Sequence, residues 1–372
     1  MEKMKILQIT NHFWPCKGGV ERSVEDLSIH LKKRGHDVSV LCLNMCGKEK
    51  NLLPETEDYH GIEIKRLQFF DLKYYKVATN VMSTVREINP DVIHVHGLGF
   101  LTDLILRNRQ KHRKPVIVST HGGIFHTKNV HSLKKIYFQN IVKAHLKNAD
   151  KIIAVSENDK KLFLTIANEA QLEMIENAID LKKFKILERK PVKNTFVFVG
   201  RISNNKRIDL LIDVFSKLKN KDFKIKIVGK DFDNLRDNLE KKAKDCGLSN
   251  KIKFAGEVNE KELIQIFKET EFFVSASEYE GFGISTIEAM ASGLIPVLNS
   301  IPSFRKFVTA GKNGFIVNFS DTKNTAIQIE RILKLSDKEK KELSKNAVKV
   351  SKNYSWSNQI KKFEKMYNDV IE

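Results

Sequence analysis

The sequence places two basic side chains directly after a strand-like segment, where they could bind a pyrophosphate. The segment NTFVFVG ends at Gly200, Arg201 follows at once, and Lys206 opens the next helical segment. An arginine can bond two phosphate oxygens together, and a lysine supplies a point charge. Fixed cations at this place would stabilise the negative charge that develops on a departing diphosphate, and one such donor contributes ~3 kcal/mol to the transition state. The alternative is that both are ordinary surface residues, in a chain with 65 lysines and arginines.

A second motif follows the strand-like segment EFFVSAS. In EYEGFGISTIEAM a helix is expected to start near Gly283, so that its free backbone N–H groups can hold phosphate. Ser285 and Glu288 are three residues apart and therefore share a helix face. Glu288 could accept hydrogen bonds from two hydroxyls of a ribose next to the phosphates. Glu280, in the preceding loop, could reach a sugar attached to the same phosphates. The alternative is an amphipathic helix whose acids are solvated.

A glycine pair, Gly18 and Gly19, lies between the first strand-like segment and the first helical segment. Two glycines there would let the backbone approach a ligand closely, with the N–H groups of the helix N-terminus open to an anion. An ordinary tight turn is the simpler interpretation of this pair. The segment also lacks the third glycine and the downstream acid of the dinucleotide-binding fingerprint.

Three histidines lie at the ends of strand-like segments: His94 and His96 in DVIHVHG, and His121 in STHGG. His94 and His96 share a strand face, because residues two apart point the same way. No cysteine or carboxylate neighbour completes a metal-ligand set, and His94 is more simply interpreted as a hydrogen-bonded core residue. For His121 we predict a functional role, because ligands bind outside the carboxyl ends of parallel strands.

Alternating strands and helices must position these residues. Short β-branched segments such as KILQIT, DVSVLCL, FKIKIVG and LIPVLN are separated by helical-period segments such as RIDLLIDVFSKLK. This pattern predicts an α/β protein with parallel sheets covered on both faces. Ten such strands are too many for one compact sheet. We therefore predict two doubly wound domains that face an interdomain cleft.

We place the boundary between these domains in the charged segment LKKFKILERKPVKN. The first domain then comprises residues 1–186 and the second comprises residues 187–353. The remaining segment, 354–372, has an amphipathic helical pattern whose apolar stripe must be buried. We expect this helix to pack back on the first domain.

The chain carries a formal net charge of +19. Such a surplus usually indicates an anionic partner, which can be nucleic acid, an acidic membrane surface or a phosphorylated substrate. The densest basic cluster could either complement the dipole of a helix C-terminus or contact anionic lipid. Its members are Arg107, Arg109, Lys111, Arg113 and Lys114.

Cysteine usage and apolar runs suggest a cytoplasmic protein. Four cysteines, Cys16, Cys42, Cys46 and Cys246, are too few for a disulfide framework, and we expect reduced thiols. The longest apolar runs fall far short of the ~18 residues that indicate a membrane span. The N-terminal segment has the pattern of a strand rather than of a signal peptide.

Glu280 and Glu288 form an E-x7-E element within EYEGFGISTIEAMASGLIPV. This segment resembles the donor-site signature of glycosyltransferase family 4, a large group of retaining enzymes with the GT-B fold. Further segments match in the same order: FWPCKGGVE, DVIHVHG, STHGG, AVSE, IENAID, GRISNNKRIDLLI, KNGFIV and SWSNQIKKF. The resemblance therefore covers nearly the whole chain. One departure is SIPSFRKFV, which stands where the family often has a Gly-rich loop followed by Glu.

The resemblance implies two Rossmann-like domains and a metal-independent, retaining hexosyl transfer that needs no cofactor. The donor would be a UDP- or GDP-linked sugar, and the acceptor a glycan or a polyprenol- or lipid-linked molecule of envelope polysaccharide or glycoconjugate synthesis. The implied donor-binding residues are Gly18, Gly19, Gly200, Arg201, Lys206, Gly281, Phe282, Gly283, Ile284, Ser285 and Glu288. The implied catalytic residues are His121, Arg201, Lys206 and Glu280.

Two other functions compete with this interpretation. A nucleotide-sugar epimerase or a sugar phosphorylase could share the fold, although the spacing of the four charged residues argues against both. A basic nucleic-acid-binding protein is the alternative of another class. The sequence lacks an aromatic stacking platform and a known nucleic-acid motif, so we expect no nucleic-acid partner. We expect a cytoplasmic protein that contacts the inner face of an anionic cytoplasmic membrane peripherally.

Overall fold

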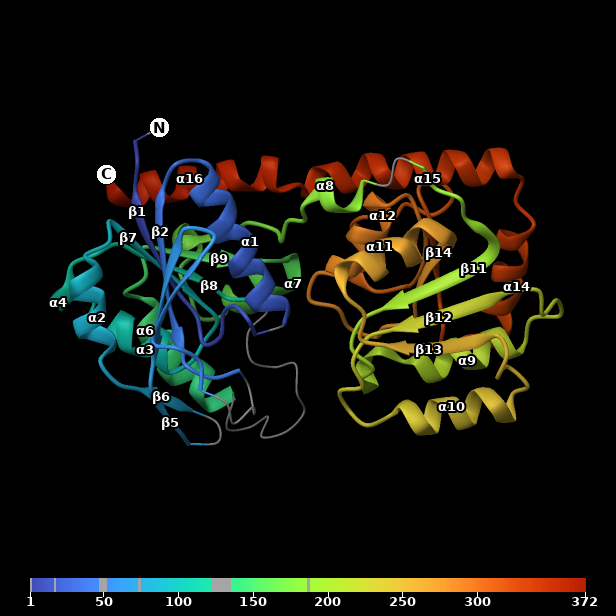
Figure 1. The fold of residues 1–372 in the computed structure, drawn as a ribbon, viewed down its shortest axis with the longest axis horizontal. Helices are drawn as coiled ribbons and strands as arrows, with labels where there is room; N and C mark the ends of the chain where they lie inside the picture. Colours follow the sequence, from blue (N-terminus) through green and yellow to red (C-terminus); the bar gives the residue numbers. More distant parts are fainter. Residues whose placement is uncertain (1, 17, 47–51, 73–74, 122–134, 186–187) are drawn as a thin grey trace. The chain divides into compact units, whose positions relative to one another are not determined.

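A computed structural model describes residues 2–16, 18–46, 52–72, 75–121, 135–185 and 188–372. The chain forms two compact units, one made of Met1–Ala178 with Trp356–Glu372 and the other of Ile179–Ser355. Each unit contains a largely parallel sheet with helices on both faces (Figure 1). The predicted α/β fold with two parallel-sheet units is therefore confirmed.

The two units divide between Ala178 and Ile179. The sequence placed this boundary at residues 186 and 187, which lie outside the described residues. Helix α8 (Leu181–Phe184) belongs to the second unit, because Phe184 is fully buried in that unit's core. A charged segment indicates a linker, but it does not tell on which unit the few apolar residues before it will pack.

The first unit contains an eight-stranded sheet in the order β10-β9-β8-β7-β1-β2-β4-β3. Its strands are β1 (Lys5–Ile9), β2 (Asp37–Leu43), β3 (Thr56–Tyr59), β4 (Ile62–Leu67), β7 (Val92–His96), β8 (Val116–Ser119), β9 (Lys151–Ala154) and β10 (Leu172–Met174). All neighbours pair in parallel except β3, which is antiparallel to β4. A separate ribbon pairs β5 (Phe69–Asp71) with β6 (Lys76–Ala78).

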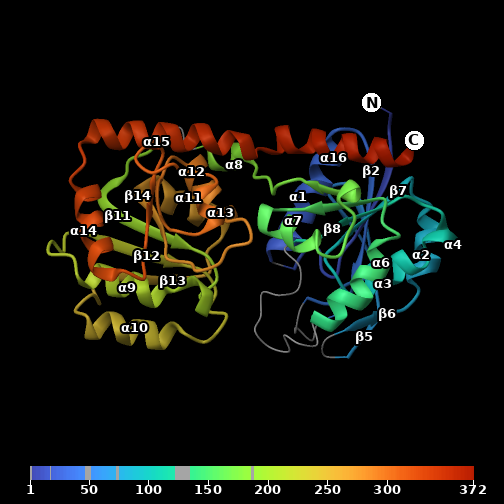
Figure 2. The same ribbon diagram turned by 180° about the vertical axis from the view of Figure 1, so that it is seen from behind.

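Helices cover both faces of this sheet. They are α1 (Gly19–Lys33), α2 (Val81–Ile88), α3 (Phe100–Arg107), α4 (Arg109–His112), α6 (Lys143–Leu146), α7 (Glu157–Phe163) and α16 (Trp356–Ile371), with short irregular helices at Tyr137–Val142 and Glu169–Gln171. Apolar residues of α1 and α16 form one core, and those of α2, α3, α6 and α7 form the other. The helices themselves can be followed in Figures 1 and 2. Burial on both faces explains the near-continuous apolar sequence of a strand such as β2.

The second unit contains a six-stranded parallel sheet in the order β13-β12-β11-β14-β15-β16. Its strands are β11 (Val192–Val199), β12 (Lys224–Val228), β13 (Ile252–Gly256), β14 (Thr270–Ser275), β15 (Ile295–Asn299) and β16 (Phe315–Val317). Besides α8, its helices are α9 (Ile208–Ser216), α10 (Arg236–Asp245), α11 (Glu260–Glu269), α12 (Ile284–Ala291), α13 (Pro302–Arg305), α14 (Thr322–Leu333) and α15 (Asp337–Ser351), with single turns at Asn204–Lys206 and Lys352–Tyr354. Helices α9, α10 and α14 pack on one face, and α11, α12, α13 and α15 on the other.

The C-terminal helix α16 supplies a large part of one core of the first unit. Trp356 is 3% exposed and packs with Ile360, Phe363 and Met366 of the same helix against α1 and the sheet. Replacing Trp356 by alanine should therefore lower the free energy of unfolding of the first unit by about 3–5 kcal/mol, measured by urea denaturation. Ile371→Ala, at an exposed position of the same helix, is the matched control. A loss for Trp356→Ala no larger than that of the control would contradict this packing.

The expectation of reduced thiols is wrong for two of the four cysteines. Cys16 and Cys46 form a disulfide, with their Cα atoms 5.2 Å apart. Cys16 follows β1 and Cys46 follows β2, and these strands are parallel neighbours, so their following loops meet at one edge of the sheet. A separation of 30 residues in sequence gives no sign of this proximity. Cys42 is a buried free thiol, and Cys246 is a partly exposed one.

Candidate active site

The loops after β11 and β14 bring the two predicted charged motifs together. These strands are neighbours in the second unit, so their carboxyl ends lie at the same sheet edge. Asn205 joins the loops, because its backbone carbonyl accepts from the N–H of Glu278 at 2.9 Å and its side chain donates to the carbonyl of Tyr279 at 3.2 Å. The loop that carries Arg201 and the loop that carries Glu280 therefore form one connected structure.

Lys206 and Glu280 form an ion pair between these loops, although 74 residues separate them in sequence. Their side chains are 13% and 16% exposed, respectively. Ser277 fixes the carboxylate further, because its hydroxyl donates to Glu280 Oε1 at 3.0 Å. An ammonium group has three donors, so Lys206 can hold Glu280 and still bond a phosphate oxygen. The sequence singled out both residues but did not indicate that they contact each other.

Arg201 is exposed, and its guanidinium lies over the ring of Phe232, 4.7 Å from the ring centre. No carboxylate pairs with Arg201 among the residues that the structure describes. Stacking on a ring face leaves the N–H donors at the edge of the guanidinium available for an anion. The sequence analysis missed Phe232, which lies in the loop after β12 and is 57% exposed. The sequence carried no signal for Phe232, because its exposure and its place against Arg201 follow from the fold.

Gly200 and Gly229 lie in close backbone contact at the ends of β11 and β12. The N–H of Gly200 donates to the carbonyl of Val228 at 2.9 Å. A Cβ atom at Gly229 would lie 1.9 Å from the carbonyl oxygen of Gly200, and Gly229 has a φ of +143°. Only glycine fits this position, so Gly229 helps to position the backbone that carries Arg201. The sequence analysis named Gly200 and overlooked Gly229.

At the start of α12, backbone N–H groups are open to a ligand, whereas the aromatic ring of Phe282 in the preceding loop is buried. Gly283 has a φ of +95° and caps α12, which begins at Ile284 as expected. The first backbone N–H groups of this helix, including those of Ile284 and Ser285, lack intrahelical acceptors and could bond an anion. Phe282 is 5% exposed and packs against Phe307, so its ring belongs to the core. Gly281 has open space around it, with no described atom within 4 Å of an added Cβ.

Glu288 lies in α12 and is only 3% exposed. It is therefore the least accessible of the four charged residues, since Lys206 and Glu280 are partly exposed and Arg201 is exposed. The segment SIPSFRKFV also contributes to this region. Ser303, within that segment, donates its hydroxyl proton to the backbone carbonyl of Glu280 at 2.5 Å.

Gly18 and Gly19 lie in the first unit, where Gly18 caps α1 and Gly19 begins it. No described atom lies within 4 Å of a Cβ built at Gly19. Packing of the described residues therefore does not require a glycine there, and a ligand-binding role for this pair stays a prediction. The neighbouring Lys17 lies outside the described residues.

His121 follows β8 with a φ of +50° and bonds His96, with His121 Nε2 and His96 Nδ1 3.0 Å apart. Burial lowers the pKa of His121 to about 4, so its imidazole is neutral at neutral pH.

His94 bonds Tyr367 and Ser119 and is fully buried, in agreement with its interpretation as a core residue. The described residues include no group of three or more His, Cys, Asp or Glu side chains that could hold a metal ion.

The basic cluster around α4 is partly used inside the first unit. Arg109 bonds Asp150 through both Nε and Nη2, at 3.2 and 3.1 Å. Asp150 also accepts from the backbone N–H of Val116, at the start of β8. Arg109 therefore has a structural role, and lipid contact by the rest of the cluster stays a prediction. In the described part of the chain, no helix has the length and apolarity to cross a membrane.

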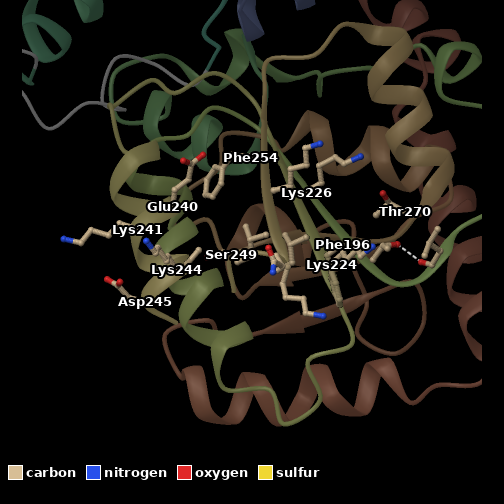
Figure 3. Close-up of a pocket in the computed structure, with 18 of the residues that line it drawn as sticks. Phe196, Lys224, Lys226, Glu240, Lys241, Lys244, Asp245, Ser249, Phe254 and Thr270 are labelled. Carbon is tan, nitrogen blue, oxygen red and sulfur yellow. Dashed lines mark hydrogen bonds between the residues drawn. The ribbon is translucent and has the colours of Figure 1, made fainter. Parts of the chain in front are cut away.

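A groove of about 1210 Å³ lies in the second unit (Figure 3). Its lining includes Lys224, Lys226, Glu240, Lys244 and Thr270. It contains none of the residues that the sequence analysis predicted for the site. Volume alone therefore does not identify the candidate active site of this chain.

Two family models match the chain, one on each unit. The model described as "Glycosyltransferase Family 4" matches residues 17–183, and the model described as "Glycosyl transferases group 1" matches residues 179–350. The two matches together span nearly all of both units.

Curated relatives and solved structures agree with these matches. A GDP-mannose:cellobiosyl-diphosphopolyprenol alpha-mannosyltransferase from Xanthomonas campestris is 31% identical over 319 residues, which cover 85% of this chain and 83% of the relative. The protein of the same name from Komagataeibacter xylinus is 30% identical over 373 residues, which cover 100% of this chain and 94% of the relative. Among solved structures, sucrose-phosphate synthase from Thermosynechococcus elongatus has a TM-score of 0.79 at 19% identity, covering 98% of both chains. Anabaena HepE in complex with UDP has a TM-score of 0.79 at 18% identity, covering 98% of this chain and 100% of that one.

Proposed function

Because this chain belongs to glycosyltransferase family 4, we propose that it transfers a hexose from a nucleoside-diphosphate sugar to a lipid-linked acceptor with retention at the anomeric carbon. The observation that carries the proposal is the Lys206–Glu280 ion pair next to Arg201 and the N-terminus of α12. This arrangement puts cations, free N–H groups and a carboxylate at one sheet edge. A pyrophosphate and its attached sugar require such a set of groups.

We propose GDP-mannose as the donor and a glycosylated polyprenol diphosphate as the acceptor. The relatives from Xanthomonas campestris and Komagataeibacter xylinus support this choice, because their names state that donor and that acceptor class. A UDP-sugar is the second candidate. It is suggested by the fold similarity to a HepE structure that contains UDP.

In the proposed reaction, an acceptor hydroxyl attacks the anomeric carbon while the bond from that carbon to the phosphate oxygen breaks. The acceptor proton passes to the departing phosphate, on the same face of the sugar. Arg201, Lys206 and the first N–H groups of α12 would bind the charge that develops on the pyrophosphate. Glu280 would bond the sugar hydroxyls, and Glu288 would bond the ribose. His121 would accept a hydrogen bond from a hydroxyl of the transferred sugar.

A panel of nucleotide sugars with a polyprenol-diphosphate glycan acceptor tests this function. We expect release of GDP from GDP-mannose together with transfer of labelled mannose to the lipid fraction. Interconversion of the nucleotide sugar without transfer would favour an epimerase, and a requirement for inorganic phosphate would favour a phosphorylase. The anomeric configuration of the new bond, read by NMR of the product, tests retention.

We also propose that the reaction needs no metal ion, because Arg201, Lys206 and the α12 N-terminus supply the positive charge for the leaving group. Activity measured after treatment with EDTA should therefore equal that of the untreated enzyme. Activity that disappears with the chelator and returns with Mg²⁺ would contradict this part of the mechanism. Addition of Mg²⁺ to untreated enzyme is the control.

A lipid-linked acceptor would require the enzyme to work at a membrane surface, and we propose peripheral attachment to the inner face of the cytoplasmic membrane. The high net charge of +19 supports attraction to anionic lipid. The Cys16–Cys46 disulfide is of a kind that is rare in cytoplasmic proteins. Fractionation of cells in low and high salt would show membrane-bound protein that salt releases.

A further inference from the structure

A row of buried hydrogen bonds in the first unit ends at His121. His96 lies between His121 and Gln8, with its Nδ1 3.0 Å from His121 Nε2 and its Nε2 2.6 Å from Gln8 Oε1. Gln8 comes from β1, and His96 ends the neighbouring strand β7. Gln8 is 0% exposed and His96 is 5% exposed, so water does not compete for these bonds.

The same row continues on the other side of Gln8. Gln8 Nε2 donates to the hydroxyl of Tyr367 at 3.3 Å. The Tyr367 oxygen lies 2.8 Å from His94 Nδ1, and His94 Nε2 lies 2.8 Å from the hydroxyl of Ser119. Tyr367 comes from α16, so the C-terminal helix takes part in this buried row.

Gln8 sets the direction of hydrogen-bond donation along the row, because its amide nitrogen only donates and its carbonyl oxygen only accepts. The carbonyl oxygen requires a proton on His96 Nε2. Burial lowers the pKa of His96 well below its usual value, so the ring is neutral and carries no second proton at Nδ1. His96 Nδ1 must then accept from His121 Nε2. The neutral ring of His121 is left with an unprotonated Nδ1.

The part of the row beyond Tyr367 follows the same direction. The hydroxyl of Tyr367 accepts from Gln8 and therefore gives its own proton to His94 Nδ1. Neutral His94 then carries its proton on Nε2 and donates to Ser119. Every bond in the row thus has one donor and one acceptor, which is the condition for burying polar groups without penalty.

We propose that Gln8 is a positioning residue that acts through His96 to keep His121 Nδ1 a hydrogen-bond acceptor for a hydroxyl group of the sugar substrate. No described group bonds His121 Nδ1, so this atom is available to a ligand. Its role towards a sugar rests on the proposed function. The tautomer itself depends only on the residues of the first unit.

Long-range ¹H–¹⁵N NMR spectra of the histidine rings in the full-length protein test the tautomer directly. We expect the proton of His121 on Nε2 and an unprotonated Nδ1 in the wild type at neutral pH. The opposite tautomer would overturn the proposal, because it would mean that the Gln8 amide is turned around. This measurement needs no substrate, so it is independent of whether the proposed function is correct.

Gln8→Met removes the amide while it keeps the length of the side chain, and Ser119→Ala is the matched control at the far end of the row. We expect a mixture of His121 tautomers in Gln8→Met and the wild-type tautomer in Ser119→Ala. With the nucleotide sugar that the wild type uses, kcat/KM should fall roughly tenfold in Gln8→Met and less than twofold in the control. Equal losses in both variants, or an unchanged tautomer in Gln8→Met, would overturn the positioning role. If the wild type turns over no nucleotide sugar, the proposed function fails and the spectra still decide the tautomer.

Discussion

Replacement of Lys206 by alanine is expected to lower kcat by about two to three orders of magnitude, because a fixed cation at a departing pyrophosphate contributes ~3 kcal/mol to the transition state. The substitution also removes the partner of Glu280, whose carboxylate is held by Lys206 and by the hydroxyl of Ser277. The effect should appear in kcat, measured as nucleotide release at saturating donor and acceptor. Arg201→Ala should act in the same direction, since its exposed guanidinium is available for an anion.

The control for this prediction is Lys226→Ala, in the groove of the same unit, whose lining contains no residue of the candidate site. It removes a positive charge of the same kind and should leave kcat unchanged. A double-mutant cycle of Lys206→Ala and Glu280→Ala should be strongly non-additive, because the two side chains form one ion pair. Near-normal kcat values in both Lys206→Ala and Arg201→Ala would contradict the pyrophosphate-binding role.

Gly229→Ala should abolish activity and destabilise the second unit by at least ~3 kcal/mol, through backbone strain and overpacking together. The added Cβ would lie 1.9 Å from the carbonyl oxygen of Gly200 and 3.4 Å from the nitrogen of Arg201. Both groups are backbone and cannot rotate away. The ends of the two strands must therefore separate, and this separation moves the loop that carries Arg201. Thermal denaturation and nucleotide release together measure the two effects.

Gly256→Ala provides the matched control for this substitution. Gly256 also ends a strand of the same sheet with a positive φ, +70°, but no described atom lies within 4 Å of an added Cβ. Only the conformational cost of about 1–2 kcal/mol is expected there, with activity retained. If both alanine variants behave alike, the contact between Gly200 and Gly229 is not the reason for the glycine.

Much of the fold was predictable from the sequence. Short apolar strands alternating with helices are a local pattern, and both parallel sheets follow from it. The start of α12 at Ile284 was also predictable, because Gly283 can adopt the left-handed conformation that caps this helix. The boundary between the units was less predictable, since it depends on where Phe184 packs and not on the composition of the linker.

The candidate site was predicted in part. The sequence singled out Lys206 and Glu280 because each follows the end of a strand, and the structure brings them together because β11 and β14 are neighbours. Phe282 was named as a donor contact, yet its ring lies in the core. Phe232 and Gly229 were overlooked, because their importance comes from Arg201 and Gly200, which only the fold brings near them.

Residue types and their spacing were enough to predict the α/β fold and the family, and they singled out the strand-end residues that we propose bind an activated sugar. These features depend on residue type and on spacing along the chain, which a sequence contains in full. The folded chain was needed to reveal the Lys206–Glu280 pair, the Cys16–Cys46 disulfide and the hydrogen bonds that connect Gln8 to His121. Each of these contacts joins segments far apart in the chain, and the order of strands in the folded sheet decides which segments meet.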